Sequence, residues 1–147
     1  MAGTFFDNGT IGVFVPEGWK AFEGIDSEGR VTHKKILVYK NVEIETDIFL
    51  RTGITVCFFG ESDFYLSPKW FYDDVCDIDG FSLGHHDFTG YTCTSLGYPY
   101  VMLESMKEGT VFQIMILLEN GEEKISLDDA DVKEILESIV YVGQKST

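Results

Sequence analysis

Residues 11–22, IGVFVPEGWKAF, contain one strand, a turn and the beginning of the next strand. The residues before Pro16 follow the pattern of a partly buried strand. Pro16 ends strand pairing because it has no backbone N–H to donate, and Gly18 permits a tight turn. Trp19 then supplies a large side chain to the core. The stretch therefore predicts two strands that meet at a sharp turn, early in a β-rich chain.

The rest of the chain holds further strand patterns, most of them joined by hairpin-length connections. Asn8-Gly9 is typical of a hairpin turn, and the apolar run GITVCFFG at residues 53–60 predicts a central strand buried on both faces. Short connections between consecutive strands favour a largely antiparallel sheet. The expected strands are Thr4–Asp7, Ile11–Val15, Trp19–Ile25, Lys35–Lys40, Gly53–Gly60, Tyr91–Ser95, Pro99–Met106 and Thr110–Leu118.

Two helices are expected to cover this sheet. Ser67 is a good N-cap and Pro68 suits the first helical position, which predicts a short helix that ends near Val75. Ser126 is expected to cap a second helix, because apolar residues recur after it with helical spacing. These residues are Val132, Ile135, Leu136 and Ile139.

The domain organisation follows from these elements. Residues 77–90 are rich in glycine and aspartate, which predicts a loop. A largely antiparallel sheet with helices on its faces is an α+β fold, here an α/β/α sandwich. The sequence thus predicts a single α+β sandwich domain over residues 1–142, followed by a polar tail at residues 143–147.

The chain is strongly acidic. Its 147 residues include 25 Asp and Glu against 11 Lys and Arg, which gives a net charge of −14. Such a surface repels phosphate groups, so nucleic acids and anionic membranes are not expected partners. A protein with a basic surface is the kind of partner that this charge favours.

The N-terminus and the cysteines indicate a location. The first ten residues, MAGTFFDNGT, lack the basic and apolar segments of a signal peptide, and no run of about 18 apolar residues predicts a transmembrane helix. Cys57, Cys76 and Cys93 form an odd set without CxxC spacing, which indicates free thiols in a reducing compartment. These features predict a cytoplasmic protein.

Two phrases of the sequence carry a resemblance to a known group of proteins. One is a strand that closes in P-x-G-W, and the other is a C-terminal helix that closes in a phrase like I-L-x-S-I-x-F. The matching residues are Pro16, Gly18, Trp19, Ile135, Leu136, Ser138, Ile139 and Tyr141. In these phrases the chain resembles the PsbP-like superfamily, which includes the Mog-type Ran-binding proteins and many bacterial domains of unassigned role. Residues 30–100 carry no part of the resemblance.

The resemblance has consequences for fold and function. It implies an α/β sandwich from a bacterial source that binds proteins or acts as an accessory subunit. The superfamily has no shared active site, so the resemblance implies no catalytic residue. A likeness at the level of the fold supports a functional expectation only by analogy.

Three short patterns are typical of enzymes or metal sites. Ser82 stands in a G-x-S-x-G pattern, but the serine mechanism needs a later histidine and none follows His86. Asp77 and Asp79 resemble part of a calcium loop that lacks two anchoring carboxylates. His85 and His86 are adjacent, so an extended chain would point them to opposite faces. We therefore assign no catalytic, metal-binding or cofactor-binding residue, and we expect no cofactor.

The stretch PKWFYDD places three aromatic residues in succession, at Trp70, Phe71 and Tyr72. A short helix cannot bury all three on one face, so at least one should be exposed. Exposed aromatic side chains among acidic ones are typical of a protein-binding surface. The predicted partner surface consists of Trp70, Tyr72, Asp77, Asp79, His85 and His86.

The leading hypothesis is a non-catalytic binding or accessory domain that mediates protein–protein interaction. Two alternatives stay open. One is a small metal-dependent or serine hydrolase that uses the aspartate, serine and histidine side chains of residues 73–87. The other is a carrier that holds a small ligand in an apolar pocket between the sheet and the helices.

Overall fold

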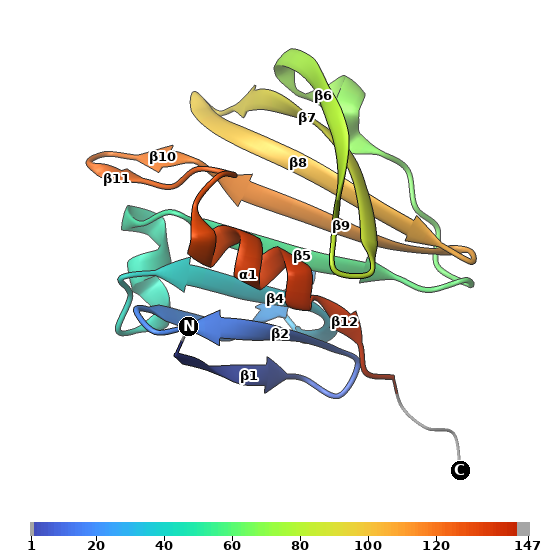
Figure 1. The fold of residues 1–147 in the computed structure, drawn as a ribbon, viewed down its shortest axis with the longest axis horizontal. Helices are drawn as coiled ribbons and strands as arrows, with labels where there is room; N and C mark the ends of the chain where they lie inside the picture. Colours follow the sequence, from blue (N-terminus) through green and yellow to red (C-terminus); the bar gives the residue numbers. More distant parts are fainter. Residues whose placement is uncertain (1, 144–147) are drawn as a thin grey trace.

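The computed structural model describes residues 2–143, most of which lie in antiparallel strands (Figure 1). Seven strands form one large sheet in the spatial order β3-β4-β5-β9-β8-β7-β6, while β1, β2 and β12 form a smaller sheet and β10 pairs with β11. The bounds are β1 Gly3–Asp7, β2 Ile11–Pro16, β3 Trp19–Ile25, β4 Val31–Lys40, β5 Gly53–Phe59, β6 Asp73–Leu83, β7 His86–Ser95, β8 Tyr98–Lys107, β9 Thr110–Leu117, β10 Glu119–Asn120, β11 Glu123–Lys124 and β12 Val140–Tyr141.

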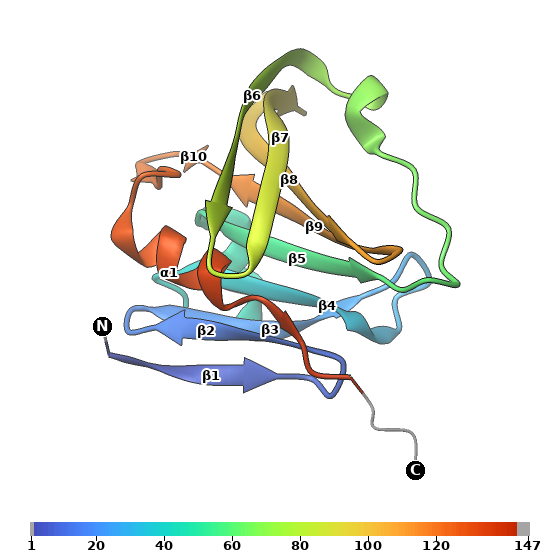
Figure 2. The ribbon, with the colours of Figure 1, turned by 45° about the vertical axis from the view of Figure 1, so that its right-hand side comes forward.

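The turn between Pro16 and Trp19 is the point at which the chain passes from one sheet to the other. β2 ends at Pro16 in the smaller sheet, and β3 begins at Trp19 on an edge of the large sheet. Gly18 lies between them with a φ of 92°, a conformation that glycine adopts without strain. Because the turn is so short, β2 lies over one face of the large sheet (Figure 2). We call this covered side the inner face.

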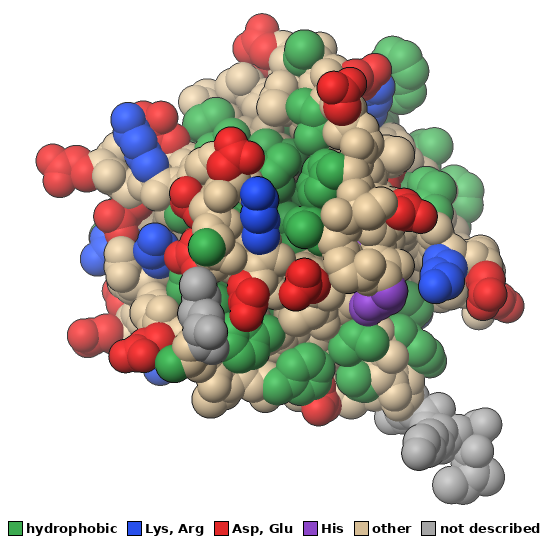
Figure 3. Space-filling view, viewed as in Figure 1, with side chains coloured by type: hydrophobic (Ala, Val, Ile, Leu, Met, Phe, Trp, Pro, Cys, Tyr) green, Lys and Arg blue, Asp and Glu red, His purple; other side chains and the backbone are tan. Residues whose placement is uncertain are grey.

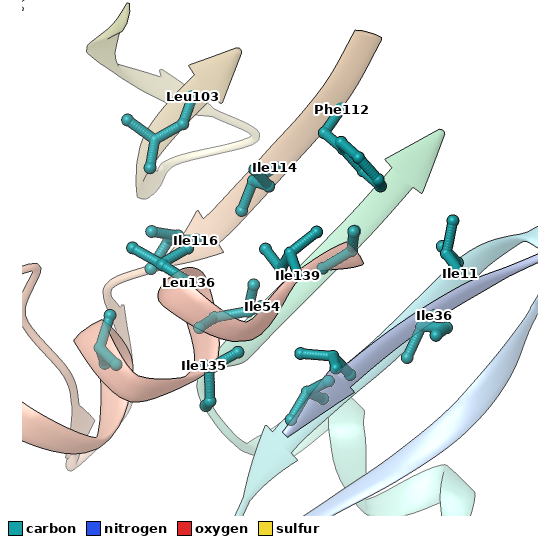
Figure 4. Close-up of a cluster of buried hydrophobic side chains, with 14 of the residues drawn as sticks. Ile11, Ile36, Ile54, Leu103, Phe112, Ile114, Ile116, Ile135, Leu136 and Ile139 are labelled. Carbon is teal, nitrogen blue, oxygen red and sulfur yellow. The ribbon is translucent and has the colours of Figure 1, made fainter. Parts of the chain in front are cut away.

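The helix α1, Ala130–Ser138, lies beside β2 over the inner face (Figures 1 and 2). The apolar stripe expected from helical spacing is fully buried, at Val132, Ile135, Leu136 and Ile139. Figure 4 shows Ile135, Leu136 and Ile139 close to side chains of the strands, among them Ile54, Ile114 and Ile116. The main core therefore sits between the inner face and the layer formed by β2 and α1.

Two polar contacts fix α1 to the N-terminal strands. Trp19, which is 8% exposed, donates a hydrogen bond from Nε1 to Oδ2 of Asp131 at 2.9 Å. The Ser138 hydroxyl accepts a hydrogen bond from the backbone N–H of Phe14 at 2.7 Å and donates one to the carbonyl of Ile135. Each phrase thus contributes one residue to these contacts, Trp19 from the first and Ser138 from the second, and their partners Asp131 and Phe14 lie beside the phrases.

The predicted α+β sandwich is wrong, because within residues 2–143 a single α-helix, which shares the inner face with β2, takes the place of helices on both faces of the sheet. In the described chain, α1 is the one α-helix, and the other helical segments are 3-10 helices, η1 at Glu45–Leu50 and η2 at Pro68–Phe71. The fold is mostly β, built on a large antiparallel sheet. The small sheet explains the difference, since Ile11, Val13 and Val15 of β2 bury apolar surface on the inner face.

The prediction of a helix after Ser67 is also wrong beyond its first turn. η2 ends at Phe71 and β6 begins at Asp73, so Val75 lies in a strand. Tandem aspartates and a β-branched valine are poor helix formers, and pairing with β7 satisfies the backbone instead.

The loop expected at residues 77–90 is most of the β6–β7 hairpin, so this expectation is wrong as well. The register of β6 shifts twice, between Asp73 and Cys76 and between Ile78 and Phe81. These bulges interrupt the alternation of apolar and polar residues, which conceals the strand pattern in the sequence.

Two further expectations concern the ends of the chain and the membrane. Residues 144–147 of the expected polar tail lie outside the described part of the chain. Between residues 2 and 143, no helix combines the length and the apolar character needed to cross a membrane.

Candidate functional site

The side of the large sheet that faces away from α1 carries a second group of apolar side chains. We call this side the outer face. Tyr91, Cys93 and Met102 are buried there, in a cluster separate from the main core. Half-buried side chains pack against them, namely those of Tyr72, Val75, Tyr100 and Met115. Among residues 2–143, no α-helix or second sheet packs over this face.

The β4–β5, β5–β6 and β7–β8 connections beside the outer face expose large apolar side chains. Trp70 is 86% exposed and Phe64 is 84% exposed on the β5–β6 connection, and Leu96 in the β7–β8 turn is 94% exposed. Exposed apolar side chains on most proteins are scattered singly. Here Phe64 and Leu96 line hollows on this face, and Trp70 lies in η2, two residues before Tyr72 of the outer-face cluster. We define the outer apolar surface as the outer-face cluster together with Phe49, Phe64, Leu66, Trp70, Phe71 and Leu96.

Two hollows show that these connections converge on the sheet. One, of about 450 Å³, is lined by Cys57 and Met115 of the sheet and by Phe64. The other, of about 390 Å³, is lined by Tyr100 of β8 and by Phe49 of the β4–β5 connection. Segments far apart in the sequence therefore contribute to one hollowed apolar surface.

Two segments beside the outer apolar surface, the β4–β5 connection and β6, are acidic, whereas Lys34 and Lys35 line the hollow at Phe64. The exposed carboxylates are those of Glu43, Glu45, Asp73, Asp74, Asp77 and Asp79. Lys69 pairs with Asp77, and its ammonium lies 5.5 Å from the ring centroid of Tyr91. Burial is the main cause that raises the pKa of Tyr91 to about 12, so its hydroxyl stays neutral at physiological pH.

A pocket of about 400 Å³ lies on the opposite side of the sheet, and we call it the inner pocket. It is bounded by the tip of the β6–β7 hairpin, the β8–β9 turn and β12. Figure 3 shows histidine surface beside apolar surface at the hairpin tip. The aromatic lining residues are Phe58, Phe112 and Tyr141, and the polar ones include Glu61, His85, His86, Ser105, Lys107, Glu108 and Thr110.

His86 is the buried polar group of the inner pocket, with 4% of its surface exposed. Its Nε2 lies 2.5 Å from the carbonyl oxygen of Ile139, and its Nδ1 lies 2.8 Å from Oγ of Ser105. Because a carbonyl only accepts hydrogen bonds, Nε2 carries the proton, and the neutral ring accepts from Ser105 at Nδ1. Burial lowers the pKa of His86 below its ordinary value of 6.5, which favours this neutral form.

The six residues of the predicted partner surface do not lie together. Trp70, Tyr72 and Asp77 belong to the outer side, and Asp79 is exposed on β6. His86, by contrast, lines the inner pocket together with His85. The two imidazole rings have centroids 4.2 Å apart and do not point to opposite faces, because Gly84 and His85 form the hairpin turn.

The residues of the hydrolase alternative are also separated. Ser82 is exposed and donates a hydrogen bond to Asp87 at 2.6 Å, whereas the ring of His86 is buried against Ser105 and Ile139. Within residues 2–143, no three side chains of His, Cys, Asp or Glu come together in a group that could hold a metal ion.

The three cysteines are free thiols in different surroundings, and we expect their reactivities to differ. Cys76 is exposed, whereas Cys57 is half-buried on the outer face rather than in the main core, and Cys93 is buried. Burial raises the pKa of both Cys57 and Cys93, which lowers their thiolate fraction.

A disulfide reagent such as DTNB at about pH 7.5 should therefore modify Cys76 well before the other two. Retention of the fast phase by Cys76→Ser would contradict this assignment.

Several residues of these two surfaces were not predicted. Ser105 had a signal in the sequence, because it continues the alternation of Val101 and Leu103 in β8 and so places a polar residue on the apolar side of that strand. No signal in the sequence indicated that Phe49, Phe64 and Leu96 belong to this surface, because their positions depend on how the connections fold over the sheet.

Comparison with models of protein families gave no match for this chain, and comparison with curated proteins gave no significant match. The resemblance to the PsbP-like superfamily stays a prediction. The functional argument therefore depends on the outer apolar surface and the inner pocket.

Proposed function

We propose that this protein is a non-catalytic binding module that docks a protein partner on the outer apolar surface. The observation that supports the proposal is an apolar sheet face without a covering layer in the described chain, with exposed apolar side chains around it. Large exposed apolar patches usually mark interaction sites. Trp70 is the side chain best suited to anchor a partner, because tryptophan is enriched among residues that dominate binding energy.

The charge of the chain favours a basic partner. Carboxylates on the β4–β5 connection and on β6 lie beside the outer apolar surface, and the whole chain carries a net charge of −14. Lysine and arginine residues around an apolar contact would complement this pattern, whereas a second copy would bring the same negative charge. We place this interaction in the cytoplasm, where free thiols such as the three found here persist.

Replacing Trp70 or Phe71 with alanine should weaken partner binding without loss of the fold. Loss of an anchoring aromatic residue commonly costs about 2 kcal/mol or more, which is about thirtyfold in Kd. Both side chains are at least 80% exposed, so the melting temperature should stay nearly constant. The measurement is capture of proteins from lysate by the immobilised chain, identification by mass spectrometry, and titration of the purified partner by calorimetry.

Phe5→Ala is the matched control, because Phe5 is a half-exposed aromatic residue on β1, outside the outer apolar surface. It should bind the partner as the wild type does. A basic partner should also bind more weakly as NaCl rises from about 0.05 to 0.5 M, since salt screens exposed charges. A partner that binds Trp70→Ala and the wild type equally would place the docking surface elsewhere.

A further inference from the structure

The inner pocket differs in chemistry from the outer apolar surface. Its aromatic wall is formed by rings that contact each other, with the centroid of Phe58 lying 5.0 Å from that of Phe112 and 4.9 Å from that of Tyr141. The ring of His86 meets Phe112 edge-on at 5.5 Å. A volume of about 400 Å³ lies within the range of pockets that hold small molecules.

The buried imidazole leaves little hydrogen-bonding capacity for a ligand. Both ring nitrogens of His86 are used, one by the carbonyl of Ile139 and the other by the hydroxyl of Ser105. A ligand that needs directional hydrogen bonds deep in the pocket would have to break one of these contacts. The interactions that the deep part of the pocket offers are contacts with aromatic rings.

The charged residues at the inner pocket are two carboxylates and one ammonium group. Glu61, Glu108 and Lys107 are all exposed, and among residues 2–143 none of them forms an ion pair with another side chain. The local charge is thus negative, and the chain as a whole carries a net charge of −14, which also attracts cations. Anionic ligands would face two carboxylates for one lysine.

We propose that the inner pocket binds a small organic cation of the alkylated ammonium class. Such cations are attracted by the π-faces of aromatic rings and need few hydrogen bonds. Tyr141, which is 53% exposed, offers such a face, while Phe58, on which it stacks, and Phe112 are each 7% exposed and complete the apolar wall. The carboxylates of Glu61 and Glu108 supply negative charge that attracts the positively charged ligand. A bare metal ion would need several oxygen ligands converging on one point, and the described chain has no such group.

Choline and tetramethylammonium are the probes for this site, titrated against the full chain at about pH 7.5 and followed by NMR of the aromatic side chains. The resonances of Tyr141 and Phe58 should shift in a saturable manner. Tyr141→Ala should weaken binding about tenfold, because it removes one ring of the wall. Tyr141 is 53% exposed, so this variant should retain the fold, which the remaining resonances will show.

Three further variants test the role of charge. Glu61→Gln and Glu108→Gln should each weaken choline binding by about two- to fivefold, whereas Lys107→Ala should strengthen it by a similar factor. Trp70→Ala should bind choline as the wild type does, because Trp70 is not among the residues that line the inner pocket. Failure of this proposal and failure of the docking proposal are therefore separable.

The proposal is overturned by any of three results. These are no saturable shift with either cation up to about 0.1 M, equal binding by Tyr141→Ala and the wild type, and preferential binding of benzoate, which has the opposite charge. The last result would assign the inner pocket to aromatic anions held by Lys107.

Discussion

Replacing Trp19 with alanine should lower the free energy of unfolding by about 3–5 kcal/mol, the usual cost of deleting a buried tryptophan side chain. Trp19 is 8% exposed and belongs to the main core, at the turn where the chain passes from the small sheet to the large one. The substitution leaves a cavity and also removes the partner of Asp131. Urea unfolding at about pH 7, followed by far-UV circular dichroism, measures the difference.

Two milder variants separate the packing of Trp19 from its hydrogen bond. Trp19→Phe keeps much of the apolar volume and removes the N–H, so the expected loss is about 1–2 kcal/mol. Asp131→Asn keeps an acceptor for Trp19 but removes the charge that faces Lys40 at 3.4 Å. Burial alone would raise the pKa of Asp131, but the bonds from Trp19 and Lys40 hold it below its ordinary value. Asp131→Asn should therefore cost less than Trp19→Ala.

Trp70→Ala serves as the control for the tryptophan deletion. Trp70 is 86% exposed, so its removal should change the free energy of unfolding by about 0.5 kcal/mol or less. A loss of less than about 1 kcal/mol in Trp19→Ala would contradict the structural role given to the turn. The comparison distinguishes Trp19, whose buried side chain stabilises the fold, from Trp70, whose side chain is exposed.

The features of the fold that the sequence predicts are those set by short-range patterns. The turn at Gly18 and the strand at Trp19 depend on residues within a few positions of each other, and the buried stripe of α1 depends on helical spacing. The β6–β7 hairpin was missed because its bulges break that local pattern. The cover on the inner face was assigned to helices alone, since only the folded chain shows that β2 shares it with α1.

The two candidate sites were less accessible to such reasoning. At least one of Trp70, Phe71 and Tyr72 was predicted to be exposed because three successive aromatic residues could not share one face, and Trp70 and Phe71 are 86% and 80% exposed. The inner pocket, however, combines the ends of β5, β8 and β9 with the hairpin tip and Tyr141. These segments meet only through long-range pairing, and no local spacing in the sequence indicates that they do.

The free energy of unfolding should fall as the pH is lowered from about 7 to about 5, with a slope of up to 1.4 kcal/mol per pH unit assigned to His86. Burial lowers the pKa of His86 in the folded state, and the positive charge of Lys107 and the ring of His85 act in the same direction. The hydrogen bond to Ile139 and the charge of Asp87 oppose the shift without reversing it. Below the unfolded pKa near 6.5, the unfolded chain therefore binds a proton that the folded chain does not.

His86→Gln tests this assignment, because glutamine retains an N–H for the carbonyl of Ile139 but does not titrate. The variant should be less stable than the wild type at pH 7 by about 1–3 kcal/mol, owing to imperfect replacement of a buried hydrogen-bonded ring. Between about pH 7 and 5, however, its stability should change little, and the curves of the two proteins should converge.

His85→Gln, which alters the exposed neighbour, should keep most of the wild-type slope. Equal slopes in the wild type and His86→Gln would show that another group controls this pH range. The titration should stop near pH 5, because carboxylates with a lowered pKa, such as Asp131, destabilise the fold only as they protonate at lower pH.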